Sequence, residues 1–340
     1  MRWGRTMVRL ALCAALFAPI SMASADPLPI RFTWIVVPGE IAPIMNATGA
    51  TLHDGHSYVG QPVHFQASTP MITALATGEI DLALLGFSSL GIAVENAGLG
   101  DLEVVLDDIR DGVEGYYSVE YMALNDGPVK TVSDLKGRIV AVNAAGSVLD
   151  VPLRMMLRRN GLEAGKDVTV IEIAPPNMGA VLLDCKADLA PMVIPFSLDP
   201  NLRAKAHTVF VEREAMQGTT EFAFYVARKS FLDKNRAAVV DFIEDYLRAL
   251  HWFYDPANRT ATLKIVADFT KLPPERFANW VYTDSKDMYR DPAGAVDAKA
   301  LQRNLDADFD TGFMKDRLDV VPHIDMSLVE EANHRLAKTP

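Results

Sequence analysis

The stretch DLKGRIVAVNAAGS, from Asp134 to Ser147, decides the fold. Its apolar run, Ile139 to Val142, is rich in β-branched residues and predicts a buried strand, and a loop of small residues follows. The apolar spacing after Ser147 predicts a helix. A strand, a small-residue loop and a helix in this order leave backbone N–H groups free at a helix N-terminus, where a small anion can bind. We therefore expect Asn143, Gly146 and Ser147 to contact a ligand, with Ser147 capping the helix or touching the ligand itself.

The first 25 residues have the composition of an export signal. Three arginines precede an apolar run from Leu10 to Ile20, and Ala23-Ser24-Ala25 is the small-residue pattern at which such signals are cleaved. We predict that residues 1–25 are a cleavable signal peptide and that the protein is delivered to a periplasm. No later stretch is an apolar run of the roughly 20 residues that a membrane-spanning helix needs.

The net charge and the length of the chain limit the classes of protein to which it can belong. The formal net charge is −11, and removing a signal with three arginines and no acidic residue takes it to about −14. Such an acidic chain is not expected to bind nucleic acid. About 315 mature residues are too many for one ordinary core, so two lobes are expected, in a monomer. Cys185 is then the single cysteine, which excludes an internal disulfide; its neighbours favour a packing role.

Two other stretches share one plan. Ile72 to Ser89 and Gly179 to Ser197 each predict a helix, a turn, a small residue followed by Asp, an apolar strand and a loop of small or polar residues. Alternating helices and strands predict parallel strands in an α/β layer, and the repetition predicts two similar lobes. We also expect a polar loop over residues 107–115 and a helix that begins at Pro273-Pro274.

These stretches together resemble the periplasmic solute-binding proteins of ABC importers, in the branch that takes nitrate, sulfonates, taurine and thiamine precursors. The resemblance covers about residues 28 to 335. It rests on the order and spacing of ALATGEIDLA (Ala74 to Ala83), DLKGRIVAV (Asp134 to Val142), YVARKSF (Tyr225 to Phe231) and the helix pattern from Ala238 to Leu250.

The resemblance implies a fold and a division of the chain. The fold is the α/β, two-lobed periplasmic binding protein fold of type 2, with a mixed sheet flanked by helices in each lobe and the ligand in the cleft. Two crossing strands would join the lobes, at Tyr117 to Ala123 and Thr220 to Ala227. Lobe 1 would comprise residues 26–118 and 229–340, and lobe 2 residues 119–228.

Loop positions in this fold supply further site candidates. Trp34 and Pro38 follow the first strand, and Trp34 either stacks on an organic ligand or belongs to the core. Ser88 and Ser89 begin a helix and offer a second N-terminus suited to an anion. Pro195 and Phe196 follow a strand of the second lobe and could close over the ligand.

The crossing strands add Tyr121 and Glu221. The Glu221 carboxylate either accepts hydrogen bonds from an amine or hydroxyl of the ligand or pairs with a nearby arginine. The predicted ligand-binding set is therefore Trp34, Pro38, Ser88, Ser89, Tyr121, Asn143, Gly146, Ser147, Pro195, Phe196 and Glu221.

The sequence gives little evidence of a metal site or of a catalytic site. His53, His56 and His64 suggest a zinc site, but they lie in a loosely spaced loop region and no Cys or Glu completes the set. We predict no metal and no cofactor. The related thiamine-precursor synthases carry a cysteine-rich iron site, which a mature chain with Cys185 alone does not match. Nucleophile-elbow, phosphate-loop and dinucleotide motifs are absent, so we predict a non-enzymatic protein.

The predicted function is capture of a small organic anion, a sulfonate or a carboxylate including aromatic acids, between lobes that close around it. The protein would then deliver the ligand to an inner-membrane ABC permease with its ATPase. Two alternatives remain open. One is a periplasmic sensor that docks a receptor, and the other is an exported enzyme on the same fold.

Overall fold

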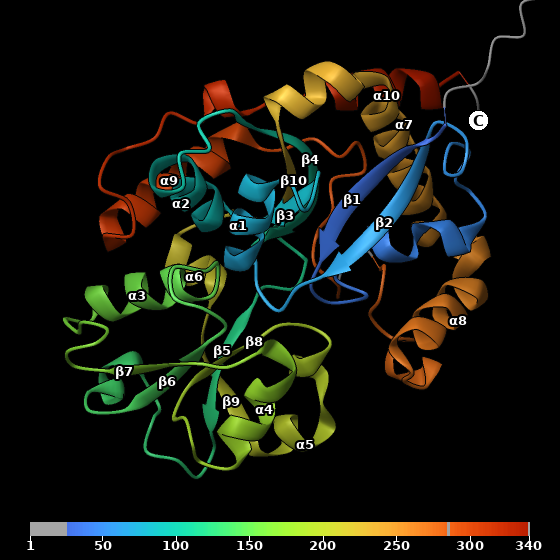
Figure 1. The fold of residues 1–340 in the computed structure, drawn as a ribbon. Coiled ribbons are helices and arrows are strands. Elements are labelled where there is room, and N and C mark those ends of the chain that lie inside the picture. Colours follow the sequence, from blue (N-terminus) through green and yellow to red (C-terminus); the bar gives the residue numbers. More distant parts are fainter. Residues whose placement is uncertain (1–25, 284–285, 339–340) are drawn as a thin grey trace, which may run out of the picture.

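The computed structural model describes residues 26–283 and 286–338, which form two lobes, one above the other in Figure 1. The predicted signal peptide lies outside the described residues. Across those two ranges, no helix has both the length and the apolar character needed to cross a membrane.

Lobe 1, the upper lobe in Figure 1, is built from both ends of the chain. Its strands are β1 (Leu28–Trp34), β2 (Tyr58–His64), β3 (Ala83–Leu85), β4 (Leu102–Asp111) and β10 (Thr220–Arg228). β1 and β2 pair in parallel, whereas β10 lies antiparallel between β3 and β4. A parallel bridge from Phe32 to Leu82 joins the two groups. The result is a mixed sheet in the order β2-β1-β3-β10-β4.

Helices flank this sheet. They are α1 (Thr69–Thr77), α2 (Phe87–Asn96), α7 (Lys229–Tyr254), α8 (Arg259–Thr270), α9 (Ala298–Thr311) and α10 (Ser327–Leu336). α7 is the longest, and its Phe242 is fully buried against the sheet. The Phe242 ring lies 5.2 Å from Phe32, 5.6 Å from Tyr58 and 6.3 Å from Tyr225, centroid to centroid. This aromatic cluster fixes α7 across three strands.

Lobe 2 repeats the same sheet. Its strands are β5 (Glu120–Leu124), β6 (Ile139–Val142), β7 (Thr169–Glu172), β8 (Ala190–Met192) and β9 (Ala206–Val211). A bridge from Val140 to Leu189 joins the parallel pair β6-β7 to the antiparallel group β8-β5-β9. The order β7-β6-β8-β5-β9 reproduces the pattern of lobe 1. Its helices are α3 (Asp150–Arg159), α4 (Pro175–Leu183), α5 (Pro200–Lys205) and α6 (Glu212–Met216).

The predicted loop over residues 107–115 is confirmed for residues 112–115, which form a bend and a turn, and wrong for residues 107–111, where β4 continues to Asp111. Its acidic residues are buried and have partners: the Tyr246 hydroxyl donates to Asp108 at 2.6 Å, and the Ser118 hydroxyl and Val119 N–H donate to Asp111. Hydrogen-bond donors from elsewhere in the chain thus offset part of the cost of burying carboxyl groups in a strand.

The crossings also differ from the predicted strands. β10 contains Thr220 to Ala227, but it pairs inside the lobe 1 sheet, so the chain is back in lobe 1 by Thr220 and not at Arg228. The outward crossing is the segment between β4 and β5, residues 112–119. The helix expected at Pro273-Pro274 is a single 3-10 turn, η5 (Pro274–Arg276).

Candidate functional site

A cavity of about 1080 Å³ opens between the lobes. Lobe 2 contributes α4, the turn η3 (Phe196–Leu198) and the start of α5; lobe 1 contributes Leu272, Glu275, Arg276, Phe277, Asn279, Trp280 and Lys286. Aromatic side chains from both lobes line it, including Tyr116, Phe196, Phe277 and Trp280. The volume is at the upper end of the range of ligand pockets, about 300–1,000 Å³. Such a cavity suits a ligand with a substantial apolar body.

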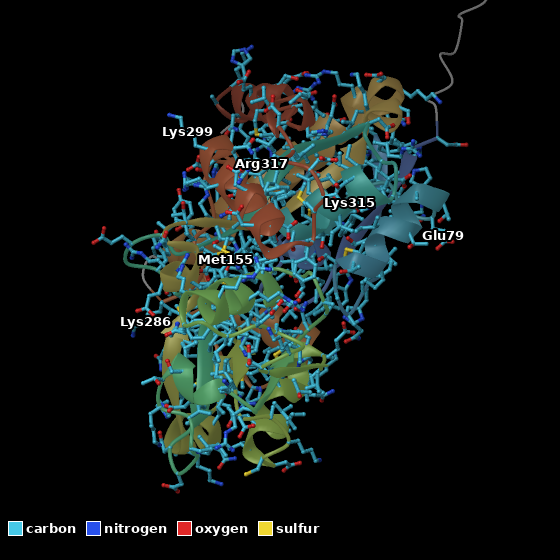
Figure 2. The ribbon with its side chains drawn as sticks, turned by 90° about the vertical axis from the view of Figure 1, so that its left-hand side faces the viewer. Glu79, Met155, Lys286, Lys299, Lys315 and Arg317 are labelled. Atoms are coloured by element: carbon cyan, nitrogen blue, oxygen red, sulfur yellow. The ribbon has the colours of Figure 1, made fainter. Side chains whose placement is uncertain are left out.

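Charged side chains gather where this cavity meets solvent. Arg276 Nη2 lies 3.2 Å from the Asp199 carboxylate of the other lobe, and Glu275 is nearby. Lys286 is exposed, and Figure 2 shows it at the outer edge of the molecule near the level where the lobes meet. Over the described residues, no acidic group lies within ion-pair distance of Lys286. Its charge is therefore available to attract an anion.

Two of the predicted site residues line this cavity, Pro195 and Phe196. The sequence analysis missed the others, because the segment from 272 to 286 carries no recognisable motif. A hint was present in the aromatic and cationic residues Arg276, Phe277 and Trp280, which lie close together in the sequence. Nothing in that segment indicates that it faces the second lobe.

The N-terminus of α2 lies at another part of the lobe boundary. A Cβ on Gly86, the residue before the helix, would lie 2.1 Å from Val148 Cγ1 of lobe 2, so the lobes touch here. Ser88 and Ser89 are fully buried in the first turn. The Ser89 hydroxyl bonds to that of Ser68 at 2.7 Å, whereas Ser88 Oγ has no hydrogen-bond partner among the described residues. An unpaired hydroxyl at an uncapped helix N-terminus is a polar group that a ligand could satisfy.

The loop after β6 is different from the prediction. Its N–H groups are occupied by the protein's own carboxylates: Gly146 N donates to Asp150 Oδ2 at 2.9 Å, and Ala145 N donates to Glu172 Oε1 at 2.8 Å. The expectation of free donors is wrong here because α3 begins at Asp150, whose side chain takes the place of an external anion. Ser147 Oγ donates to Asn143 Oδ1 at 2.5 Å.

Trp34 and Pro38 make contacts within lobe 1. The half-buried Trp34 ring lies 4.3 Å from the His64 ring and 5.3 Å from Phe269, centroid to centroid. Pro38 is buried, and its carbonyl accepts hydrogen bonds from the Tyr282 hydroxyl at 3.0 Å and from Arg290 at 3.3 Å. These contacts fix the loop after β1.

Tyr121 and Glu221 are fully buried near the crossings. Tyr121 stacks on Phe210 at 4.3 Å, and its hydroxyl donates to the Leu149 carbonyl. Glu221 follows the second alternative of the sequence analysis, since Arg110 Nε donates to its carboxylate at 2.6 Å. Burial raises the pKa of Glu221 in spite of Arg110. Tyr121 therefore stabilises the interior of lobe 2, and Glu221 that of lobe 1.

The chain is similar in sequence to a known protein family and to a nitrate-binding protein. The profile of the NMT1-like family matches residues 38–267. The nitrate/nitrite binding protein NrtA of Synechococcus elongatus is 26% identical over 156 residues, which make up 44% of this chain and 35% of that protein. The match thus spans about a third of the curated relative's length.

Solved structures share the whole fold. The periplasmic aliphatic sulphonate binding protein SsuA of Escherichia coli superimposes with a TM-score of 0.68 at 21% identity, over 88% of this chain and 93% of that one. The alkanesulfonate-binding protein SsuA of Xanthomonas axonopodis pv. citri, bound to MOPS, gives 0.68 at 18%, over 89% and 99%. The desulfurization enzyme DSZB gives 0.62 at 11%, over 91% and 99%, so enzymes also occur on this fold.

Two α/β lobes with matching mixed sheets and a cavity between them define the type 2 periplasmic binding protein fold. The chain belongs to the NMT1-like family, which confirms the family indicated by its sequence.

Proposed function

We propose that this protein is the substrate-binding component of an ABC importer and that it captures an organic anion with an apolar body. The observation that carries the proposal is the interlobe cavity, with aromatic side chains from both lobes and Lys286 at its rim. A relative's complex with MOPS, a bulky organic sulfonate, supports the same ligand class. The size and apolar lining of the cavity favour an organic acid over nitrate.

Binding would couple to movement of the lobes. The cavity has walls from both lobes, so only an approach of the lobes gives a ligand all of its contacts. Among the sequence-predicted residues, Pro195 and Phe196 would contact a ligand in this cavity, because both line it, whereas a ligand contact by Ser88, which lies outside the lining, stays a prediction. Asn143, Gly146, Ser147 and Ser89 would position the lobe boundary.

The remaining parts of the proposal follow from the family. The predicted signal peptide would export the chain to the periplasm, where a monomer would bind its ligand and deliver it to the membrane permease with its ATPase. The protein would act without chemical turnover, and bound ligand recovered after denaturation would be unaltered. Recovery of a modified compound would favour the enzyme alternative.

The ligand class is tested by thermal melting of the mature chain with sulfonates, carboxylates, aromatic acids, nitrate and neutral solutes. A ligand at 100 times its dissociation constant adds roughly 2.7 kcal/mol to the free energy of unfolding, which is a shift of several degrees. We expect bulky organic anions to give the shift. A shift with neutral or cationic solutes alone would refute the proposed ligand class.

The site is tested by two matched substitutions. Lys286→Gln removes the rim charge and should weaken anion binding, whereas Lys299→Gln, on the outer face of lobe 1 in Figure 2, should not. Phe196→Ala removes an aromatic wall and should weaken binding of the apolar body. Unchanged affinity in both Lys286→Gln and Phe196→Ala would place the ligand elsewhere.

A further inference from the structure

We propose that lobe 1 carries a transition-metal site, formed by His53, Asp241 and Glu244. This proposal is independent of the ligand cavity, because none of the three residues lines that cavity. One potential ligand atom from each residue lies within 4.8 Å of the others. The sequence analysis considered His53 with His56 and His64, but the structure brings His53 to two carboxylates of α7 instead.

Helix geometry explains the two carboxylates. Asp241 and Glu244 are three residues apart on α7, so both side chains lie on one face. His53 Nε2 lies 3.2 Å from Glu244 Oε2. Two ligands bonded to one zinc ion at about 2.1 Å in a tetrahedron are about 3.4 Å apart. This pair therefore has the spacing of two ligands that share an ion, and Asp241 offers the third ligand atom within 4.8 Å of both.

Two arginines orient the carboxylates, and one of them, Arg335, also lies 4.0 Å from Glu244 Oε2 through its Nη1. Arg248 Nη2 donates to Glu244 Oε1 at 2.8 Å, so the other oxygen, Oε2, is the one that faces His53. Arg335 Nη1 donates to Asp241 Oδ1 at 2.6 Å and leaves Oδ2 for an ion. Metal-binding carboxylates in proteins are commonly held by hydrogen bonds of this kind.

The loop that carries His53 is held in place by the next carboxylate of α7. Asp245 accepts hydrogen bonds from the N–H groups of Leu52 at 2.6 Å, His53 at 3.0 Å and Asp54 at 3.1 Å, and from the Tyr58 hydroxyl at 2.9 Å. Charge-assisted bonds to three consecutive N–H groups fix the backbone of the loop. The His53 ring is thus placed before any ion binds, which reduces the entropy cost of binding.

The chemistry of the set favours a borderline divalent ion. His53 Nε2 is buried, lies 3.2 Å from Glu244 Oε2 and makes no hydrogen bond of good geometry with the described residues, so it can coordinate an ion when it is unprotonated. One imidazole with two carboxylates suits zinc, or cobalt or nickel, better than magnesium or calcium, which prefer all-oxygen sites. A water molecule would take the fourth position. Four carboxylates (Asp241, Glu244, Asp245, Glu331) against three guanidinium groups (Arg236, Arg248, Arg335) leave one negative charge for the ion to neutralise.

Zinc titration of the chelator-treated full chain by calorimetry tests the proposal. We expect one zinc ion per chain, and a loss of roughly tenfold or more in affinity in His53→Ala. His56→Ala is the matched control, because His56 is an exposed residue of the same loop that lies outside the set, and it should bind zinc as the parent does. Absence of binding, or equal affinity in His53→Ala, would overturn the proposal.

Cobalt gives a second readout. The absorption of the cobalt-loaded chain should show a low-symmetry, four-coordinate spectrum that is lost in His53→Ala and altered in Asp241→Asn. Circular dichroism of the metal-free variants establishes that they are folded. A spectrum identical to that of hydrated cobalt would mean that His53 and Glu244 form only an ion pair.

Discussion

Arg276 of lobe 1 and Asp199 of lobe 2 lie 3.2 Å apart, guanidinium to carboxylate, beside the interlobe cavity. Both side chains are nearly half exposed, at 46% and 43%. Asp199 also accepts the N–H groups of Asn201 and Leu202 at the start of α5, so its carboxylate is shared. An exposed, shared ion pair of this kind holds two surfaces together only weakly.

Arg276→Ala should therefore change the free energy of unfolding by less than about 1 kcal/mol, an effect that decreases further in high salt. Urea denaturation at low and high ionic strength measures it. Asp199 is unsuitable for this purpose, since its loss would also remove the N-cap of α5. A cost above about 2 kcal/mol would show that the pair is a principal contact between the lobes.

Arg158 should matter more, on another part of the lobe boundary. From α3 it donates to the carbonyls of Asp310 and, at 2.9 Å, Thr311, at the end of α9 in lobe 1. Arg158→Ala removes the charged donor of these carbonyls, and since these hydrogen bonds are exposed or half-buried, we expect a loss of about 0.5–1.5 kcal/mol in stability. We also expect a larger radius of gyration in small-angle scattering, because the lobes would separate more readily.

Arg159→Ala is the control for this change. The adjacent side chain donates to the Glu214 carbonyl at 3.0 Å, within lobe 2. It should lower stability modestly and leave the radius of gyration unchanged. Equal scattering curves for the two variants would contradict a role for Arg158 between the lobes.

Gly146→Ala tests the close contact of the loop after β6. Gly146 has φ +67°, and an added Cβ would lie 3.0 Å from Ile92 Cδ1 and 3.2 Å from Phe313 Cδ1, both of lobe 1. Gly161 has a similar φ of +72° but open space around it. Both alanine variants incur the backbone strain, about 1–2 kcal/mol, and Gly146→Ala should lose about 1–3 kcal/mol more from overpacking. Equal melting temperatures would mean that Ile92 and Phe313 adjust freely.

Asp308 should make stability depend on pH. Its carboxyl is fully buried on α9, and neither oxygen has a hydrogen-bond partner among the described residues. Burial, with Glu95 and Asp150 nearby, raises the pKa of Asp308 to about 8. The folded protein therefore keeps a proton that the unfolded chain loses near pH 4. The contribution of Asp308 to stability therefore falls as pH rises from about 4 to 8, by up to about 1.4 kcal/mol per pH unit.

Asp308→Asn removes this proton uptake. The variant should gain stability over the parent as pH increases from 5 to 8, measured by urea denaturation at each pH. Asp126→Asn, at an exposed turn of lobe 2, is the control and should follow the parent at every pH. A constant difference between Asp308→Asn and the parent would show that Asp308 is ionised in the folded state.

Local patterns predicted much of this architecture. Ile139 to Val142 is strand β6, and the repeated helix–strand plan corresponds to two sheets with the same strand order. These predictions succeed because apolar periodicity reports burial of each segment wherever its partners lie. Family membership could also be predicted, because the order of such segments along the chain is itself a property of the sequence.

Structural features that depend on residues far apart in the sequence could not be predicted from it. The acidic residues of β4 led to the prediction of a loop. No residue near Asp108 in the sequence indicates its hydrogen-bond partner, Tyr246, which lies 138 residues later. Glu172 takes the Ala145 donor from 27 residues away. The walls of the cavity come from both lobes and meet only when the lobes are assembled, so their residues share no local pattern.

The position of β10 has a consequence for how the chain acquires its structure. This strand joins β3 to β4 in lobe 1, yet it follows all of lobe 2 in the sequence. As the chain is synthesised, the strands of lobe 2 are complete first, and β4 lacks its neighbour until residue 228 has been added. During that interval the edge of β4 is unpaired, and Asp107, Asp108 and Asp111, which are buried in the folded lobe, are exposed to solvent.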